Sequence, residues 1–263
     1  GKFLNDKKNF DIKELEPYFS NLLNNIDLKK LEFSSINDFS FNINKKLKFN
    51  DFKVETIINL DQLIFNEKNL KLKRFFPSFV EEVKLEKHKI EINYNKNKLD
   101  IKGNGNFLLE DKSDNLSYQM IKKGNNFLFD SKINLKNNSL LIDFLDYEKK
   151  EGSSSSVSFK GILNKNNQLR FNFINLKEKN NEISIKDLVL NENFKIIDIE
   201  NFNINYKNNK KILNNLNLKK NKSNFIIEGE SLDASKMINN IMNSDEENLS
   251  IFDNLNAKIN IKI

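Results

Sequence analysis

Histidine is the side chain most suited to acid–base chemistry near neutral pH, and the chain contains a single one, His88. It stands among Lys84, Glu86, Lys87 and Lys89, in a segment with the pattern of a strand. Cysteine is absent, so every nucleophile–base pair would have to use this one histidine. We interpret His88 as a solvated surface residue and not as a catalytic base or a ligand.

Carboxylates and glycines add little further chemistry. Paired carboxylates must face one another across a substrate, whereas Asp143 and Asp146 have opposite parity on a predicted strand. The segment Gly103-Asn104-Gly105-Asn106 is too short for a dinucleotide-binding fingerprint and does not open a helix. Two glycines in a strand instead indicate a bend or a bulge. The chain is therefore predicted not to be an enzyme, and to need no cofactor and no metal.

The composition narrows the range of partners. The 263 residues carry 43 basic and 37 acidic side chains, a formal net charge of +6, and these charges are interleaved with apolar residues. Without a dense block of lysine and arginine, a solvated outer face is favoured over a nucleic-acid-binding surface. The sequence has no run of about 20 apolar residues that would span a bilayer. Because it begins with Gly1 and has no apolar leader, we expect an excised piece of a longer chain, with any membrane anchor outside it.

The elements that would position these side chains are strands. From Glu182 to Gly229, apolar residues recur two apart, with Lys, Asn, Asp, Glu and Ser between them. Side chains alternate across a strand, so this period predicts a sheet with one apolar face and one wet face. The same period runs through most of the chain and predicts about seventeen strands joined mostly by short turns. Parallel pairs would need crossover helices, so an antiparallel meander is expected.

Two short helices are predicted near the ends of the chain. Spacing of three and four residues between apolar side chains predicts an amphipathic helix from Asp11 to Asn25. A second helix is predicted after Gly229, with Ser231, Asp233 or Ser235 able to cap its first turn. We therefore expect an N-terminal segment with a helix over residues 1–25, a β module over 26–243 that ends in a short helix, and the start of a further, truncated module over 244–263.

Two short helices are too few to cover the apolar face of so long a sheet. The sheet must either fold on itself as a closed sandwich or solenoid, serving as a structural or adhesive module, or stay open as a groove. Exposed apolar patches beyond a few hundred Å² mark ligand or membrane surfaces. An open groove would accept acyl chains along its length.

The strand Phe225-Ile226-Ile227-Glu228-Gly229, followed by Glu230 to Ser235 opening a short helix, resembles the end of the groove module in AsmA-like proteins, especially the YhdP and TamB group of bridge-like lipid transfer proteins. The segment from Glu182 to Leu190, and the helix to Asn25 with Leu28 to Phe33 after it, look similar to that family's repeated units. The resemblance covers most of the chain in architecture, through patterned hydrophobicity.

The resemblance implies a mainly β fold, a long and strongly curved antiparallel meander that forms an open groove. It implies the periplasmic portion of an inner-membrane-anchored protein of the cell envelope, which shields phospholipid acyl chains on their way to the outer membrane and so supports outer-membrane biogenesis. The expected lining makes nonpolar contact with lipid and comprises Leu99, Ile101, Phe107, Leu109, Phe127, Phe129, Ile133, Phe171, Phe173, Ile183, Ile185, Phe202 and Ile204.

Overall fold

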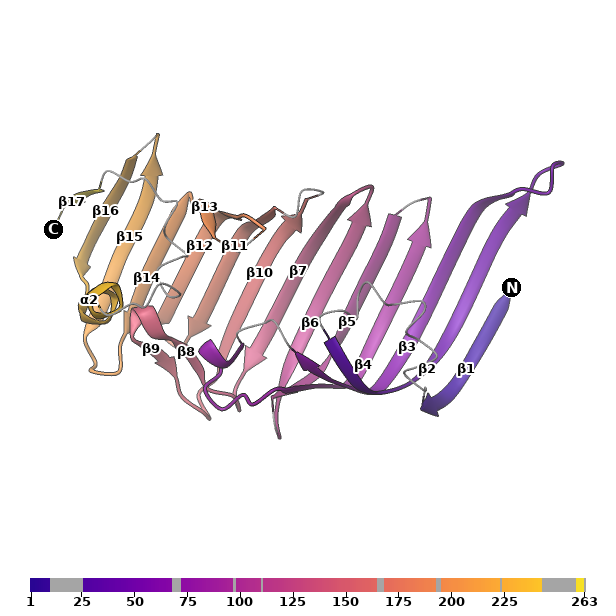
Figure 1. Ribbon diagram of the computed structural model, residues 1–263, viewed down its shortest axis with the longest axis horizontal. Helices are drawn as coiled ribbons and strands as arrows, with labels where there is room; N and C mark the ends of the chain where they lie inside the picture. Colours follow the sequence, from indigo (N-terminus) through magenta and orange to yellow (C-terminus); the bar gives the residue numbers. More distant parts are fainter. Residues whose placement is uncertain are drawn as a thin grey trace. The chain divides into compact units, whose positions relative to one another are not determined.

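The computed structural model describes residues 1–9, 26–67, 72–96, 98–109, 111–164, 168–192, 195–222, 224–242 and 259–262 (Figure 1). These residues are mainly in strands. The chain divides into two compact units, unit 1 with Gly1–Lys73 and Ser78–Phe127, and unit 2 with Arg74–Pro77 and Leu128–Ile263. The division falls inside the predicted module 26–243.

The described residues of unit 1 form a six-stranded antiparallel meander in which each strand pairs with the next along the chain. Its strands are β1 (Lys2–Asn9), β2 (Ile26–Ile43), β3 (Phe49–Glu67), β4 (Glu82–Asn95), β5 (Lys98–Leu109) and β6 (Lys112–Lys123). The 3-10 helix η1 (Leu72–Arg74) lies in the irregular connection after β3, where Pro77 predicts a break in the strand pattern.

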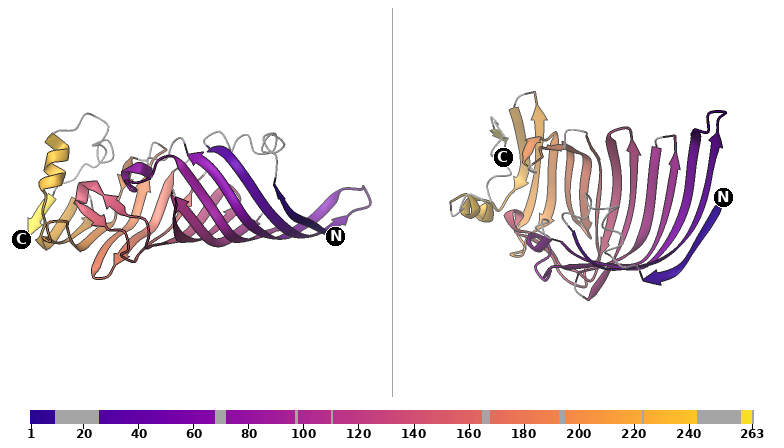
Figure 2. Two further views of the ribbon diagram at one scale, coloured as in Figure 1. Left: turned by 90° about the horizontal axis from the view of Figure 1, so that it is seen from below. Right: turned by 45° about the vertical axis from the view of Figure 1, so that its right-hand side comes forward.

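The longest strands of unit 1 bend where their pairing register shifts. The pairing of β2 with β3 shifts between Leu28 and Lys30 and again between Glu32 and Phe33. The pairing of β4 with β5 shifts between Glu86 and Lys89. Each shift inserts an extra residue into one strand, which bends it and increases its twist. Figure 2 shows β2 and β3 as long strands that curve along their length.

Unit 2 continues the same architecture. Its sheet runs in the order β7 (Asn126–Leu135), β10 (Ser155–Leu163), β11 (Leu169–Glu178), β12 (Asn181–Leu190), β14 (Asn201–Lys207), β15 (Leu213–Asn221) and β16 (Asn224–Ser231). From β10 to β16, each strand pairs antiparallel with the next in this order. Within the described ranges, no pairing closes either sheet into a barrel. The predicted mainly β, open antiparallel meander is confirmed.

Three features of the described residues depart from the predicted simple meander. Strands β8 (Leu140–Ile142) and β9 (Tyr147–Lys149) form a separate two-stranded sheet around the 3-10 helix η2 (Asp143–Leu145). Strand β13 (Ile196–Asp198) pairs with β12 beside the main path. Strand β17 (Ile259–Lys262) pairs parallel to β16, because its connection contains helix α2 (Ser235–Met242) and can cross over.

The helix predictions have different outcomes. Helix α2 confirms the predicted second helix. The predicted helix from Asp11 to Asn25 lies outside the described residues. None of the helices in the described ranges is long and apolar enough to cross a membrane.

Candidate functional site

Unit 1 has one apolar face, defined by the side chains that stand in register across its strands. Residues paired across a sheet share a face. The apolar face of unit 1 consists of the rows Val54, Tyr94 and Leu99; Thr56, Ile92, Ile101 and Met120; Ile58, Ile90, Gly103 and Tyr118; and Leu63, Leu85 and Phe107. Leu99, Ile101 and Phe107 of this face are among the lining residues expected from the sequence.

The opposite face of unit 1 is polar. Lys30 Nζ donates to Gln62 Oε1 at 2.8 Å, and Gln62 Nε2 donates to Glu86 Oε1 at 3.1 Å, so a polar ladder crosses three strands. Lys89 and Glu91 form an exposed ion pair farther along β4. One wet face and one apolar face are thus present on the same sheet.

His88 lies on the apolar face, and the interpretation of this residue as a solvated surface histidine is wrong. Its side chain is only 1% exposed, and Nε2 lies 2.9 Å from the carbonyl oxygen of Asn106. The register shift at Lys87, whose φ is +53°, changes the phase of β4, so that Leu85 and His88 lie on the same face. Burial lowers the pKa of the imidazole below its ordinary value of 6.5.

Two glycines of β5 leave room for aromatic rings to pack close to the strand. A Cβ at Gly105 would come within 2.3 Å of His88 Cδ2, and one at Gly103 within 2.4 Å of the Tyr118 ring. The rings of His88 and Tyr118 lie 6.0 Å apart. The bulge suggested by these glycines is present, but it lies in the neighbouring strand β4 and not in β5.

A small polar cluster interrupts the apolar face of unit 1 between β2 and β3. Asn37 Nδ2 donates to Ser35 Oγ at 3.0 Å, and Thr56 Oγ1 donates to Asn37 Oδ1 at 2.9 Å. Ser35 and Thr56 are buried. The alternation of apolar residues does not reveal this cluster, because its members are polar; the parity that Asn37 shares with Phe39 is the signal that places Asn37 on this face.

Unit 2 has a comparable apolar face that begins with three phenylalanines. The ring centroid of Phe129 lies 5.5 Å from that of Phe171 and 6.2 Å from that of Phe159. Gly161 lies beneath the Phe129 ring, where a Cβ would approach to 2.5 Å. The face continues into a buried cluster of Leu188, Ile196, Ile199 and Phe225, against which Phe171, Ile174, Ile185 and Phe202 pack.

Phe173 does not belong to this face. It stands in register with Lys160 on one side and Lys186 on the other, so it shares the polar face with these lysines. Its neighbour Ile174 packs with Phe171 on the apolar face, three residues away instead of two. The phase of β11 changes between Phe171 and Ile174, opposite Asp187, whose φ is +48°. The expected role of Phe173 in the lining therefore conflicts with the register.

The segment that holds β8, η2 and β9, here called the insert (residues 136–154), packs on the apolar face of unit 2. Tyr147 is fully buried, and its ring meets that of Tyr206 edge to face at 5.4 Å. Tyr147 donates its hydroxyl hydrogen to Glu178 Oε2 at 2.8 Å, and Tyr206 donates to the carbonyl oxygen of Leu145. Burial is the main cause that raises the pKa of both tyrosines well above 10.

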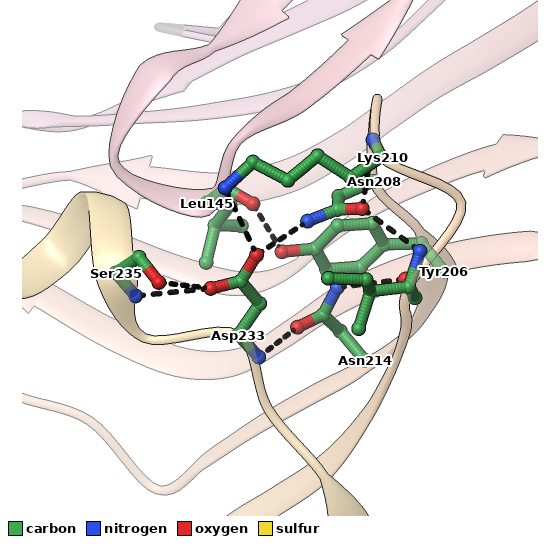
Figure 3. A network of polar contacts seen from close by, with 8 residues as sticks. Leu145, Tyr206, Asn208, Lys210, Asn214, Asp233 and Ser235 are labelled. Atoms are coloured by element: carbon green, nitrogen blue, oxygen red, sulfur yellow. Dashed lines mark hydrogen bonds and ion pairs between the residues drawn. The ribbon is translucent and has the colours of Figure 1, made fainter.

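A polar network fastens α2 beside the insert (Figure 3). The Asp233 carboxylate accepts hydrogen bonds from the backbone N–H of Ser235 at 3.1 Å and from Asn208 Nδ2 at 3.0 Å. Lys210 Nζ lies 3.5 Å from the same carboxylate. Hydrogen bonds from Ser235 are the main cause that lowers the pKa of Asp233 below its ordinary value. Asp233 is thus the residue, among the three predicted, that holds the start of α2.

The remaining predicted lining residues fall into two groups. Phe107 and Leu109 in unit 1, and Ile183 and Ile204 in unit 2, are buried core residues. The partly exposed residues are Leu99, Ile101, Phe127, Phe129, Ile133, Phe171, Ile185 and Phe202. Lys122 Nζ lies 5.3 Å from the centroid of the Phe127 ring, within cation–π distance. Partly exposed apolar side chains are the ones able to contact a ligand.

The described residues contain no group of three or more His, Cys, Asp or Glu side chains able to hold a metal ion. The chain matches no known family model, no curated protein and no solved structure. The chemistry that the geometry of the site offers is nonpolar contact along one face of a sheet, with charged groups on the opposite face.

Proposed function

We propose that this chain is a lipid-binding β-groove module of the AsmA-like kind, which shields phospholipid acyl chains during transport between membranes. The observation that carries the proposal is the apolar face of unit 1, whose partly exposed row Ile92, Ile101 and Met120 crosses three strands. Each CH₂ group of an acyl chain buried on this row would contribute about 0.8 kcal/mol of favourable binding free energy.

The curvature of unit 1 supports the same proposal. Leu60 is buried beside one register shift, and Val83 and Leu109 are buried elsewhere on the same face, whereas charged residues occupy the extra positions Lys29, Asp61 and Lys87. A bent sheet shields the side chains on the inside of the bend. The burial pattern therefore favours an apolar concave side, the form that a groove requires.

The proposal extends to the cell-envelope role implied by the resemblance. A protein that shields acyl chains in an envelope would be held at the inner membrane by an anchor beyond residues 1–263 and would deliver phospholipid toward the outer membrane. The competing assignment, a closed structural or adhesive module, requires a sheet that folds on itself, and the open pairing in both units disfavours it.

Native mass spectrometry with lipid extraction tests the proposal on the chain purified from a bacterial host. We expect phospholipid to co-purify with the unmodified chain and to be lost from Ile101→Lys, which places a charge in the apolar row. The matched control is Ile57→Lys, because Ile57 is an exposed isoleucine in register with Glu91 on the polar face. A lipid-free chain that takes up no added phospholipid would refute the groove.

A further inference from the structure

The hairpin between β2 and β3 extends beyond its neighbouring strands. Among the described residues, pairing with β1 ends at the contact of Gly1 with Phe39, and pairing of β3 with β4 ends at Lys53 and Asn95. Residues 40–52, here called the β2–β3 tip, therefore pair only within this hairpin. Figure 2 shows the tip projecting from the sheet of unit 1.

The β2–β3 tip exposes large apolar side chains that continue the apolar face. Phe39, Phe41 and Ile43 have one parity on β2, and Phe49 stands in register with Ile43. The rings of Phe41 and Phe49 lie 4.9 Å apart, and Phe49 is 67% exposed. Phenylalanines in a dry core would not be this exposed, so the apolar surface extends into solvent at the tip.

The apex of the tip presents Leu47, which is 80% exposed and has a φ of +57°. A branched apolar residue is rare in this left-handed conformation, where Gly or Asn is the ordinary choice. Asn44 Oδ1 accepts hydrogen bonds from the backbone N–H groups of Lys46 and Lys48, at 2.9 and 3.0 Å. The turn is thus held by its own hydrogen bonds, and it directs Leu47 outward.

Positive charge surrounds these apolar side chains. Residues 40–53 contain four lysines and one aspartate, and Asp51 accepts a hydrogen bond from Asn42. A shallow hollow at the base of the tip is lined by Lys53 and Lys96 together with Ser40, Phe41, Asn42 and Asp51. Apolar side chains ringed by lysines suit the boundary between acyl chains and anionic headgroups.

We propose that the β2–β3 tip inserts into the surface of an anionic phospholipid bilayer, with Leu47 and Phe49 among the acyl chains and the lysines at the headgroup phosphates. This inference rests on the proposed lipid-binding function, because the role of the tip would be to connect the lipid-binding face of unit 1 to a membrane. The occupant is a lipid surface and not a protein, since the charge complements phosphate and the apolar strip continues a face proposed to hold lipid.

The chain has no tryptophan, so a single introduced one reports on the tip alone. We expect the emission of Leu47→Trp to shift to the blue on phosphatidylglycerol vesicles, and to be quenched by lipids brominated in their acyl chains. Phosphatidylcholine vesicles should give a much weaker response. Phe49→Trp repeats the measurement at a position where an aromatic side chain already stands.

Val80→Trp is the matched control, because Val80 is 68% exposed but is followed by Glu81 and Glu82. Its emission should not change on the same vesicles. Adding Lys45→Glu, Lys46→Glu and Lys48→Glu to Leu47→Trp should weaken vesicle binding by at least about tenfold. Equal emission shifts at positions 47 and 80 on vesicles would overturn the inference. An emission shift at position 47 that grows with protein concentration in the absence of vesicles would also overturn it, because it would indicate that the tip binds a second copy of the chain.

Two further results separate this inference from the proposed function. If the chain carries no co-purified lipid but its tip inserts into vesicles, the membrane contact is supported and the lipid-binding groove is refuted. Lipid co-purification with no vesicle response at positions 47 and 49 would keep the groove and reject the membrane contact.

Discussion

His88 couples the stability of unit 1 to pH, because its imidazole is buried in the apolar face with its ring against Gly105. Burial lowers the folded-state pKa below 6.5. Between that lowered value and about pH 6.5, the unfolded chain binds a proton that the folded chain does not. Protonation of His88 therefore does not reduce the free energy of unfolding above about pH 6.5. Below that pH the free energy of unfolding decreases as the pH falls toward the folded-state pKa.

We expect the free energy of unfolding to decrease between pH 7.5 and pH 5.5, by no more than about 1.4 kcal/mol per pH unit from this one group. Urea denaturation at a series of pH values measures the slope. His88→Phe keeps a ring over Gly105 and removes the titrating group, so its slope over this range should be smaller. Identical slopes in the two chains would show that His88 is not the source.

The two glycines of β5 should respond differently to the addition of a methyl group. At Gly105 the new Cβ would lie 2.7 Å from the backbone Cα of His88, whereas at Gly103 the nearest atoms belong to the end of the Tyr118 ring. A side-chain ring can move more easily than backbone. Gly105→Ala should therefore destabilise the chain by about 1–3 kcal/mol and Gly103→Ala by less, as measured by chemical denaturation. The reverse order would mean that the β4 backbone yields more readily than the ring.

At the scale of elements, the insert of unit 2 is held by a buried cation. Lys149 is fully buried, and its ammonium group donates to the carbonyl oxygens of Lys136 at 2.9 Å and Asn138 at 2.5 Å. Lys149→Met should leave these acceptors without that donor and destabilise the chain by about 2–3 kcal/mol. Urea denaturation measures the loss, and hydrogen exchange over Leu140–Lys149 should show faster opening of the insert.

The adjacent Lys150 provides the control for this substitution. It is exposed, so Lys150→Met changes the same charge without removing a buried donor. It should leave both the unfolding free energy and the exchange rates nearly unchanged. Equal effects at positions 149 and 150 would assign the loss to net charge and not to the buried contacts.

The alternation of apolar residues was sufficient to predict a mainly β, antiparallel meander, but not the bounds of every strand or the phase through each one. Val83 and Leu85 have one parity and Ile90 and Ile92 the other, so the sequence does contain the signal of the bulge that buries His88. Phe173 conflicts with the prediction for the same reason, since a phase change within β11 depends on the pairing and not on local pattern.

The insert was harder to predict because Leu140 and Ile142 have the spacing of an ordinary strand. Only tertiary pairing reveals that β8 and β9 leave the main sheet and bury Tyr147 against Tyr206. The β2–β3 tip was also missed. Its phenylalanines share the pattern of core residues, and the pattern does not reveal that β1 and β4 stop short of them.

For the molecule as a whole, bound lipid should raise stability by mass action. A ligand that binds only the folded chain stabilises it by about 2.7 kcal/mol at a free concentration 100 times its dissociation constant. We expect added phospholipid to raise the melting temperature of the delipidated chain and of Ile57→Lys, measured by scanning calorimetry, and to leave that of Ile101→Lys unchanged. An equal rise in all three chains would indicate binding away from the apolar row.

The pairing of each strand with its nearest neighbour along the main path also bears on how the chain is assembled. In unit 1 every strand after the first completes a hairpin with the one before it, so contact order is low for an all-β protein. Such a sheet can grow strand by strand as the chain is synthesised, with each new strand stabilised by the edge already formed. Unfolding is then cooperative only between neighbouring strands, as in repeat proteins. A destabilising substitution in one hairpin should therefore increase local unfolding mainly in the strands beside it.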